Sequence, residues 1–166
     1  MRKSILYAAS TLMALACQPA IAKDVQLHLT AKEVSLPIDN KGQVPGPVLR
    51  VTEGDTDTFT LTNDPANKNS HSIDLHAARV DVIQDFESIK PGETKTFSFV
   101  ATHPGAFYYH CGADPMYQHI ARGMFGVILV DPKDPKALPK ADREYILVQS
   151  EVYQNPDDLH SIMKSD

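Results

Sequence analysis

The residues best suited to chemistry lie in one short stretch, residues 110–124, which reads HCGADPMYQHIARGM. Within it, His119 follows Cys111 by eight residues and Met124 follows His119 by five. A thiolate, an imidazole and a thioether are soft ligands that select copper over hard cations. Two histidines and one cysteine in a plane, with a distant axial methionine, form a type 1 (blue) copper site. The stretch therefore predicts three of the four ligands of such a site.

The fourth ligand must be a histidine from a distant part of the chain. His71, in the sequence HSIDLH at residues 71–76, is the obvious candidate. Zinc is an alternative metal for these residue types. However, a set with a single cysteine and a methionine is a poor structural zinc site. The predicted cofactor is therefore one type 1 copper.

A second metal site follows from the geometry of strands, in which successive side chains point to opposite faces. His110 and Cys111 are adjacent and must oppose each other. His71 and His76 are five residues apart and also oppose each other if residues 71–76 form a regular strand. When Cys111 and His71 point inward, His110, His76 and Asp74 share the other face. Two imidazoles suit Cu(II), and Asp74 could hold a water molecule or relay a proton.

The elements that must position these residues are predicted to be strands. Alternating or continuous apolar runs, separated by Pro-Gly and Gly-Asp turn signals, occur at residues 25–29, 58–62, 96–100, 125–130 and 145–148. Residues 125–130 are apolar throughout, which is typical of a strand buried on both faces. Helix is expected only as about one turn near residues 116–122. The pattern predicts an all-β fold, a single Greek-key β-sandwich of seven or eight strands.

The first 22 residues have the features of a signal peptide. Arg2 and Lys3 are followed by an apolar run too short to span a bilayer, and Ala20-Ile21-Ala22 forms a small-x-small site for cleavage after Ala22. A competing interpretation, lipid attachment at Cys17, lacks the usual large aliphatic residue three positions earlier. We therefore expect a periplasmic protein with a folded domain over residues 23–153 and a polar tail over residues 154–166.

The charge and the cysteine content of the sequence limit the kinds of partner that the protein is expected to bind. The formal net charge is −5, and removal of the two basic residues of the leader makes the mature chain more acidic. This disfavours nucleic acid and anionic lipid as partners, and leaves copper ions and a basic periplasmic redox partner. Cys111 is the only thiol of the predicted domain, so no disulfide can form within it. A bound metal would protect this lone thiol from oxidation.

Three segments carry a resemblance to a known family: residues 44–55, residues 71–76 and residues 109–126. They resemble the first cupredoxin domain of copper-containing nitrite reductases and multicopper oxidases, over a region from about Gly42 to about Tyr153. The resemblance implies a cupredoxin fold and assigns a role to each candidate residue. The implied type 1 ligands are His71, Cys111, His119 and Met124, two implied ligands of a type 2 catalytic copper are His76 and His110, and the implied active-site acid is Asp74.

In those reductases a second cupredoxin domain follows, and a neighbouring subunit completes the type 2 site. The present sequence ends soon after that domain would begin. We therefore expect a protein closer to the single-domain periplasmic cupredoxins of copper tolerance, with electron transfer or Cu(I) oxidation as its activity. Two alternatives stay open. One is a homo-oligomer, expected to be a trimer, that reduces nitrite at interfacial type 2 copper, and the other is a simple electron carrier.

Overall fold

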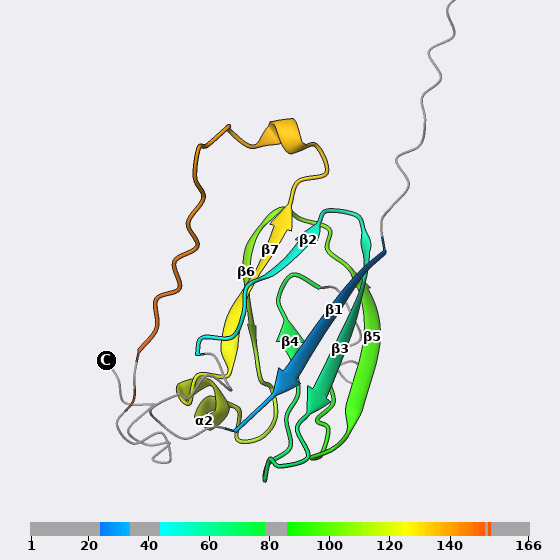
Figure 1. Cartoon of the computed structure of the whole chain (residues 1–166), viewed down its shortest axis with the longest axis vertical. Coiled ribbons are helices and arrows are strands. Elements are labelled where there is room, and N and C mark those ends of the chain that lie inside the picture. Colours follow the sequence, from blue (N-terminus) through cyan, green and yellow to red (C-terminus); the bar gives the residue numbers. More distant parts are fainter. Residues whose placement is uncertain (1–23, 34–43, 79–85, 152, 154–166) are drawn as a thin grey trace, which may run out of the picture.

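The computed structural model describes residues 24–33, 44–78, 86–151 and 153 (Figure 1). The predicted leader and polar tail lie outside these residues. The elements in chain order are β1 (Asp24–Ala31), β2 (Leu49–Thr52), β3 (Thr56–Asn63), β4 (Asp74–Leu75), β5 (Thr94–Val100), β6 (Gly105–His110), α2 (Met116–Ala121), β7 (Phe125–Asp131) and the 3₁₀ turn η1 (Pro135–Ala137). Within the described ranges, no helix has the length and apolar character needed to cross a membrane.

The strands form two sheets that face each other (Figure 1). One has the order β1-β3-β5 and the other the order β2-β7-β6-β4. β1 runs parallel to β3 and β2 runs parallel to β7, whereas the other neighbouring pairs are antiparallel. Sheet neighbours that are distant in sequence are the mark of Greek-key connections. The predicted all-β sandwich is therefore confirmed.

The core follows from strict alternation along β3, which reads TDTFTLTN. Phe59 and Leu61 point inward and are buried, and the Phe59 ring lies 5.5 Å from that of Phe97 on β5. The intervening threonines point outward and pair across the strands, with Thr60 Oγ1 at 3.0 Å from Thr96 Oγ1. Apolar burial on one face and polar pairing on the other fix the register of this sheet.

Tyr109 connects the second sheet to the segment that precedes β2. Its hydroxyl donates to the carbonyl of Pro47 at 2.7 Å. Its ring lies so close to Gly46 and Gly126 that a Cβ atom on either glycine would overlap the ring or its hydroxyl. Because Tyr109 lies two residues before Cys111 on the same face, this packing fixes the end of β6 where the candidate metal centre begins.

The strands predicted at residues 25–29, 58–62, 96–100 and 125–130 are all present, and so is the predicted helical turn. The prediction of a strand at residues 145–148 is wrong. This segment belongs to no sheet, and Tyr145 and Leu147 are 73% and 92% exposed. The assumption that residues 71–76 form a regular strand is also wrong, because only Asp74–Leu75 is strand and His71 makes an isolated bridge to Ile89.

Candidate metal centre

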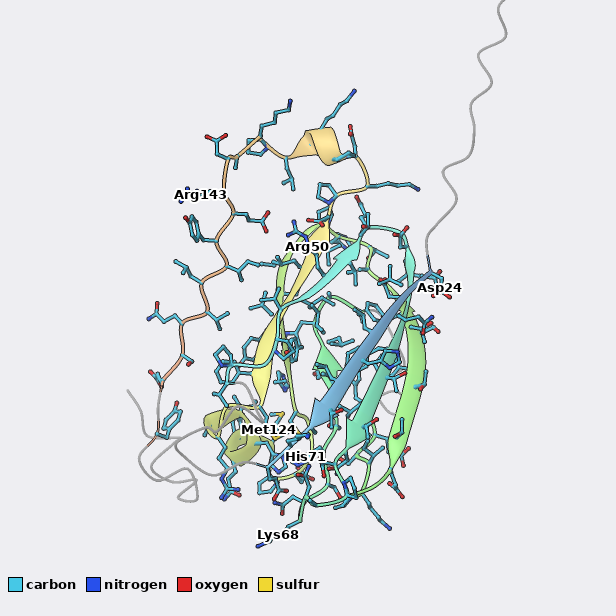
Figure 2. The ribbon with its side chains drawn as sticks, viewed as in Figure 1. Asp24, Arg50, Lys68, His71, Met124 and Arg143 are labelled. Carbon is cyan, nitrogen blue, oxygen red and sulfur yellow. The ribbon has the colours of Figure 1, made fainter. Side chains whose placement is uncertain are left out.

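Three buried side chains converge at the end of the sandwich next to α2, where Figure 2 labels His71 and Met124. Cys111 Sγ lies 3.2 Å from His119 Nδ1 and 3.8 Å from His71 Nδ1. The two Nδ1 atoms are 3.3 Å apart. One sulfur and two imidazole nitrogens thus face a common point, which is the arrangement of the planar ligands of a type 1 site.

Met124 belongs to the same centre by position. It lines the cavity of about 750 Å³ that His71, Cys111 and His119 also line. Its carbonyl oxygen accepts a hydrogen bond from Cys111 N at 3.0 Å, and its own N–H donates to His119 O at 3.1 Å. The backbone therefore connects the methionine to two of the three converging residues.

Each converging residue is held by a different element. His71 exchanges both backbone hydrogen bonds with Ile89, at 3.0 and 2.8 Å. Cys111 directly follows β6, and His119 lies on α2. Ser72 connects two of these elements, because its N–H points at Cys111 Sγ at 3.5 Å and its hydroxyl accepts from Gly112 N at 3.0 Å. The group is preorganised by backbone contacts before any metal is considered.

His71, Cys111 and His119 form the inner group, and their electrostatics fit a soft metal ion. Burial lowers the pKa of both His71 and His119, so both imidazoles are neutral at pH 7 and have a lone pair to donate. Burial raises the pKa of Cys111, although hydrogen bonds from Ser72 and Ala113 oppose this rise. A cation such as copper would supply the positive charge that a thiolate needs in so apolar a site. The donor set is therefore suitable for copper.

A second group, the outer group, lies on the outer face of the β2-β7-β6-β4 sheet and consists of Asp74, His76 and His110. Asp74 and His110 are direct cross-strand partners on β4 and β6, so their side chains share a face. His76 Nε2 lies 3.1 Å from His110 Nε2, and Asp74 Oδ2 lies 3.9 and 4.0 Å from these two nitrogens. The structure thus brings together Asp74, His76 and His110 as the sequence predicted, in reach of one metal ion.

A backbone contact orients His110 for this role. Its Nδ1 lies 3.0 Å from the carbonyl oxygen of Cys111, an acceptor, so Nδ1 carries the proton. In the neutral ring the lone pair is then on Nε2, which faces His76 and the outer surface. The exposed fractions of the side chains are 46% for His76 and 10% for His110, so a small molecule can approach the group from the side of His76.

The contact between Glu33 and His71 was not predicted. Glu33 follows β1 and places Oε1 at 3.4 Å from His71 Nε2, on the side of the ring away from Cys111. Nothing local in the sequence signals this contact, because it depends on the parallel pairing of β1 with β3. The centre consequently contains an acidic group as well as the predicted donors.

Known proteins are similar to this chain in sequence and in fold. The multicopper oxidase family matches residues 25–135. The copper-containing nitrite reductase of Neisseria meningitidis serogroup A is 38% identical over 151 residues, which cover 81% of this chain and 38% of the relative. The corresponding enzyme of Cereibacter sphaeroides is 37% identical over 87% of this chain and 40% of its own length.

Solved structures agree with these relatives. The copper nitrite reductase from Nitrosomonas europaea has 62% identity and a TM-score of 0.80, over 85% of this chain and 53% of that one. The multicopper oxidase mgLAC has 29% identity and a TM-score of 0.57, over 68% of this chain and 40% of that one. This chain therefore spans about two fifths to one half of the length of these proteins.

Proposed function

Because this chain belongs to the multicopper oxidase family, whose nitrite-reductase relatives contain copper, we propose that it is a copper redox protein with two coupled sites. In this proposal His71, Cys111, His119 and Met124 hold a type 1 copper. Asp74, His76 and His110 form part of a second copper site at which nitrite is reduced. Bound copper supplies the one-electron redox chemistry that the side chains of this chain lack.

The observation that carries the proposal is the adjacency of His110 and Cys111. The two residues belong to different groups, yet one peptide bond joins them and the hydrogen bond from His110 Nδ1 to Cys111 O joins them again. An electron entering at the thiolate thus has a short covalent path to the outer imidazole. A simple electron carrier has no need of a second donor group at the other end of that path.

Asp74 suits the proton chemistry of the proposed reaction. Nitrite takes up one electron and two protons to give nitric oxide and water, with cleavage of one N–O bond. A carboxylate whose oxygen lies 3.9 and 4.0 Å from two imidazole nitrogens can orient nitrite and pass a proton to the departing oxygen. Because the described residues offer two imidazoles here, we propose that a second copy of the chain contributes a further ligand in a homo-oligomer, expected to be a trimer.

The complete inner donor set supports a second candidate function. A periplasmic protein of copper tolerance could use the type 1 site alone to oxidise Cu(I) to the less membrane-permeant Cu(II). One electron would pass from Cu(I) to the inner site and then to a periplasmic redox partner. In this alternative His76 and His110 would bind the incoming ion. In a plain electron carrier they would have no role.

Copper stoichiometry separates these functions. We would measure copper per chain, visible absorption and electron paramagnetic resonance (EPR) on the wild-type protein and on Cys111→Ser and His76→Ala, with His28→Ala on the exposed face of β1 as the control. Two coppers, with a different signal lost in each site variant and none in the control, support the paired sites. One copper, lost only with Cys111, contradicts the second site and leaves the type 1 functions.

Activity assays then choose between the remaining possibilities. Nitric oxide formed from nitrite with a reduced donor, and lost in His76→Ala, supports nitrite reduction, and light scattering gives the oligomeric state. Bleaching of the oxidised type 1 signal by added Cu(I), without nitric oxide formation, supports Cu(I) oxidation instead. The absence of both reactions in a protein with two coppers contradicts both enzymatic functions.

A further inference from the structure

The side of His71 that faces away from the cysteine meets a carboxylate. His71 is 1% exposed, its Nδ1 faces Cys111 and His119, and its Nε2 has no hydrogen bond of good geometry among the described residues. The polar contact of Nε2 is Glu33 Oε1 at 3.4 Å, which is within ion-pair range but longer than a typical hydrogen bond. A buried imidazole N–H needs an acceptor, and Glu33 is in position to be that acceptor.

Glu33 is held in this position by the loop that leads to His71. Its Oε1 accepts hydrogen bonds from Lys68 N at 3.1 Å, from Asn69 N at 2.8 Å and from Asn69 Nδ2 at 2.9 Å. Its own N–H donates to Asn67 Oδ1 at 2.8 Å. Four hydrogen bonds thus attach Glu33 to residues 67–69, so the carboxylate is preorganised beside the imidazole.

The same contacts keep Glu33 ionised. Burial alone would raise the pKa of this carboxyl group, but the backbone N–H groups of Asn69 and Lys68 and the Asn69 amide lower it below its usual value. A carboxyl group is ordinarily ionised at neutral pH, so these contacts hold a negative charge on the far side of a candidate copper ligand.

We propose that Glu33 is a positioning residue of the type 1 copper site, which accepts the Nε2–H of His71 and favours Cu(II) over Cu(I). This inference rests on the copper site proposed above. A carboxylate that accepts the outer N–H of a metal-bound histidine fixes the ring orientation and tautomer and makes the ligating nitrogen more basic. A nearby negative charge also stabilises the more highly charged ion, so Glu33 lowers the reduction potential.

The two histidines of the inner group differ in their contacts with carboxylates. In the part of the chain that the structure describes, no carboxylate lies within ion-pair distance of His119. Burial, and after it the nearby His71 and Arg122, lower the pKa of the His119 imidazole. Glu33 therefore contacts the inner group through His71, although its charge also acts on His119, where it opposes the lowering of the pKa.

The rival explanation is that Glu33 serves only to attach the loop to β1. Two substitutions separate these roles. Glu33→Gln keeps a side-chain oxygen of the same reach for Lys68 N and Asn69 N but removes the charge. Glu33→Asp keeps the charge but shortens the reach to the loop. Glu93→Gln is a matched control, because Glu93 is an exposed carboxylate that accepts Lys90 N at 2.6 Å in a turn and has no contact with His71.

The experiment measures Cu(II) and Cu(I) affinity and the reduction potential of the copper-loaded full chain, with urea unfolding of the copper-free chain alongside. We expect Glu33→Gln to lower Cu(II) affinity about 10- to 100-fold, as changes to the hydrogen-bond partner of a metal-bound histidine typically do, with a smaller effect on Cu(I). A tenfold preferential loss of Cu(II) corresponds to a potential raised by about 59 mV. Glu33→Asp should stay closer to the wild-type potential, although it loses more stability, and Glu93→Gln should match the wild type.

The opposite ranking of the two Glu33 variants in reduction potential and copper affinity overturns the inference. If Glu33→Gln retains the wild-type potential and affinities while Glu33→Asp loses them, Glu33 acts only as a structural attachment. Equal potentials in all variants overturn it as well. If the wild-type protein gives no Cys111-dependent copper signal, the proposed function itself fails, and this outcome is distinguishable because it appears before any Glu33 variant is compared.

Discussion

His110 Nδ1 lies 3.0 Å from the carbonyl oxygen of Cys111, so an imidazole of the outer group is hydrogen-bonded to the backbone of the residue that supplies the inner thiolate. His76 supplies the other imidazole of the outer group. Its side chain contacts His110, and its backbone N–H donates to Tyr108 O at 3.0 Å. The two outer histidines therefore differ in their connection to the inner group.

Substitution of the two outer histidines should reveal this difference. Both His76→Ala and His110→Ala should lose the outer copper. Only His110→Ala should also alter the visible and EPR spectra of the type 1 site, because it removes the hydrogen bond to Cys111 O. Spectra recorded at equal inner-site occupancy check this. Identical type 1 spectra in the two variants would show that the hydrogen bond does not couple the sites.

Gly126→Ala should destabilise the protein through Tyr109. The new Cβ would overlap the ring and hydroxyl of Tyr109, which is held from the other side at Gly46 and bonded to Pro47 O. Forced overpacking of this kind costs about 1–3 kcal/mol in the free energy of unfolding. Urea denaturation of Gly126→Ala, Tyr109→Leu and the double variant measures it. The two effects should be non-additive, because the smaller leucine makes room for the methyl group.

Much of the fold followed from alternation in the sequence, because a strand with one buried face must repeat every two residues. The same rule placed Cys111 and His110 on opposite faces. The inward direction predicted for the His71 side chain is correct, but for a different reason from the one assumed. An isolated bridge to Ile89, not a continuous strand to His76, directs its side chain inward.

Other features depend on pairing that alternation alone does not reveal. Residues 145–148 form a short apolar run like that of a strand, but such a run does not supply a neighbouring strand, and in the structure they are paired with none. Glu33 reaches His71 only because β1 lies parallel to β3. Two buried polar residues of β3 could have been predicted from the sequence. Asp57 and Asn63 have the same parity as Phe59 and Leu61, so a buried carboxyl group and a buried amide were implied by the pattern.

Asn63→Ala should weaken both the fold and the metal centre. The Asn63 amide is fully buried, donates to Asn69 O and Ile89 O at 3.0 Å each, and accepts from Asn67 Nδ2 at 2.7 Å. Its loss leaves buried groups without partners, at a cost of about 1–3 kcal/mol for such a group. Copper affinity should fall too, because Ile89 is the bridge partner of His71.

The measurements for Asn63 are urea unfolding and Cu(II) titration. Thr62→Ala is the neighbouring control, since its hydroxyl pairs with Thr94 on the outer face and its loss should change stability by no more than about 0.5 kcal/mol. A lower stability with unchanged copper affinity would mean that the amide supports the sandwich but not the position of His71.

Asp57 should make the stability of the protein depend on pH. Its carboxyl group is fully buried, and neither oxygen has a hydrogen-bond partner among the residues that the structure describes. Burial, with the nearby charges of Asp55 and Asp24, raises the pKa of Asp57 from 3.8 to about 7. The folded state then binds the proton more tightly than the unfolded chain, so the stabilisation is complete below pH 3.8 and is lost as the pH rises through about 7.

Asp57→Asn removes this titration and keeps the size of the side chain. The variant should therefore be more stable than the wild type above pH 7, and its advantage should shrink towards pH 4 as wild-type Asp57 becomes protonated. Urea midpoints of both proteins between pH 4 and pH 8.5 test this, with the exposed Asp142→Asn as a control for a lost surface charge. A pH-independent difference would mean that Asp57 keeps the same charge when the chain folds, since only a changed proton affinity makes the difference vary with pH.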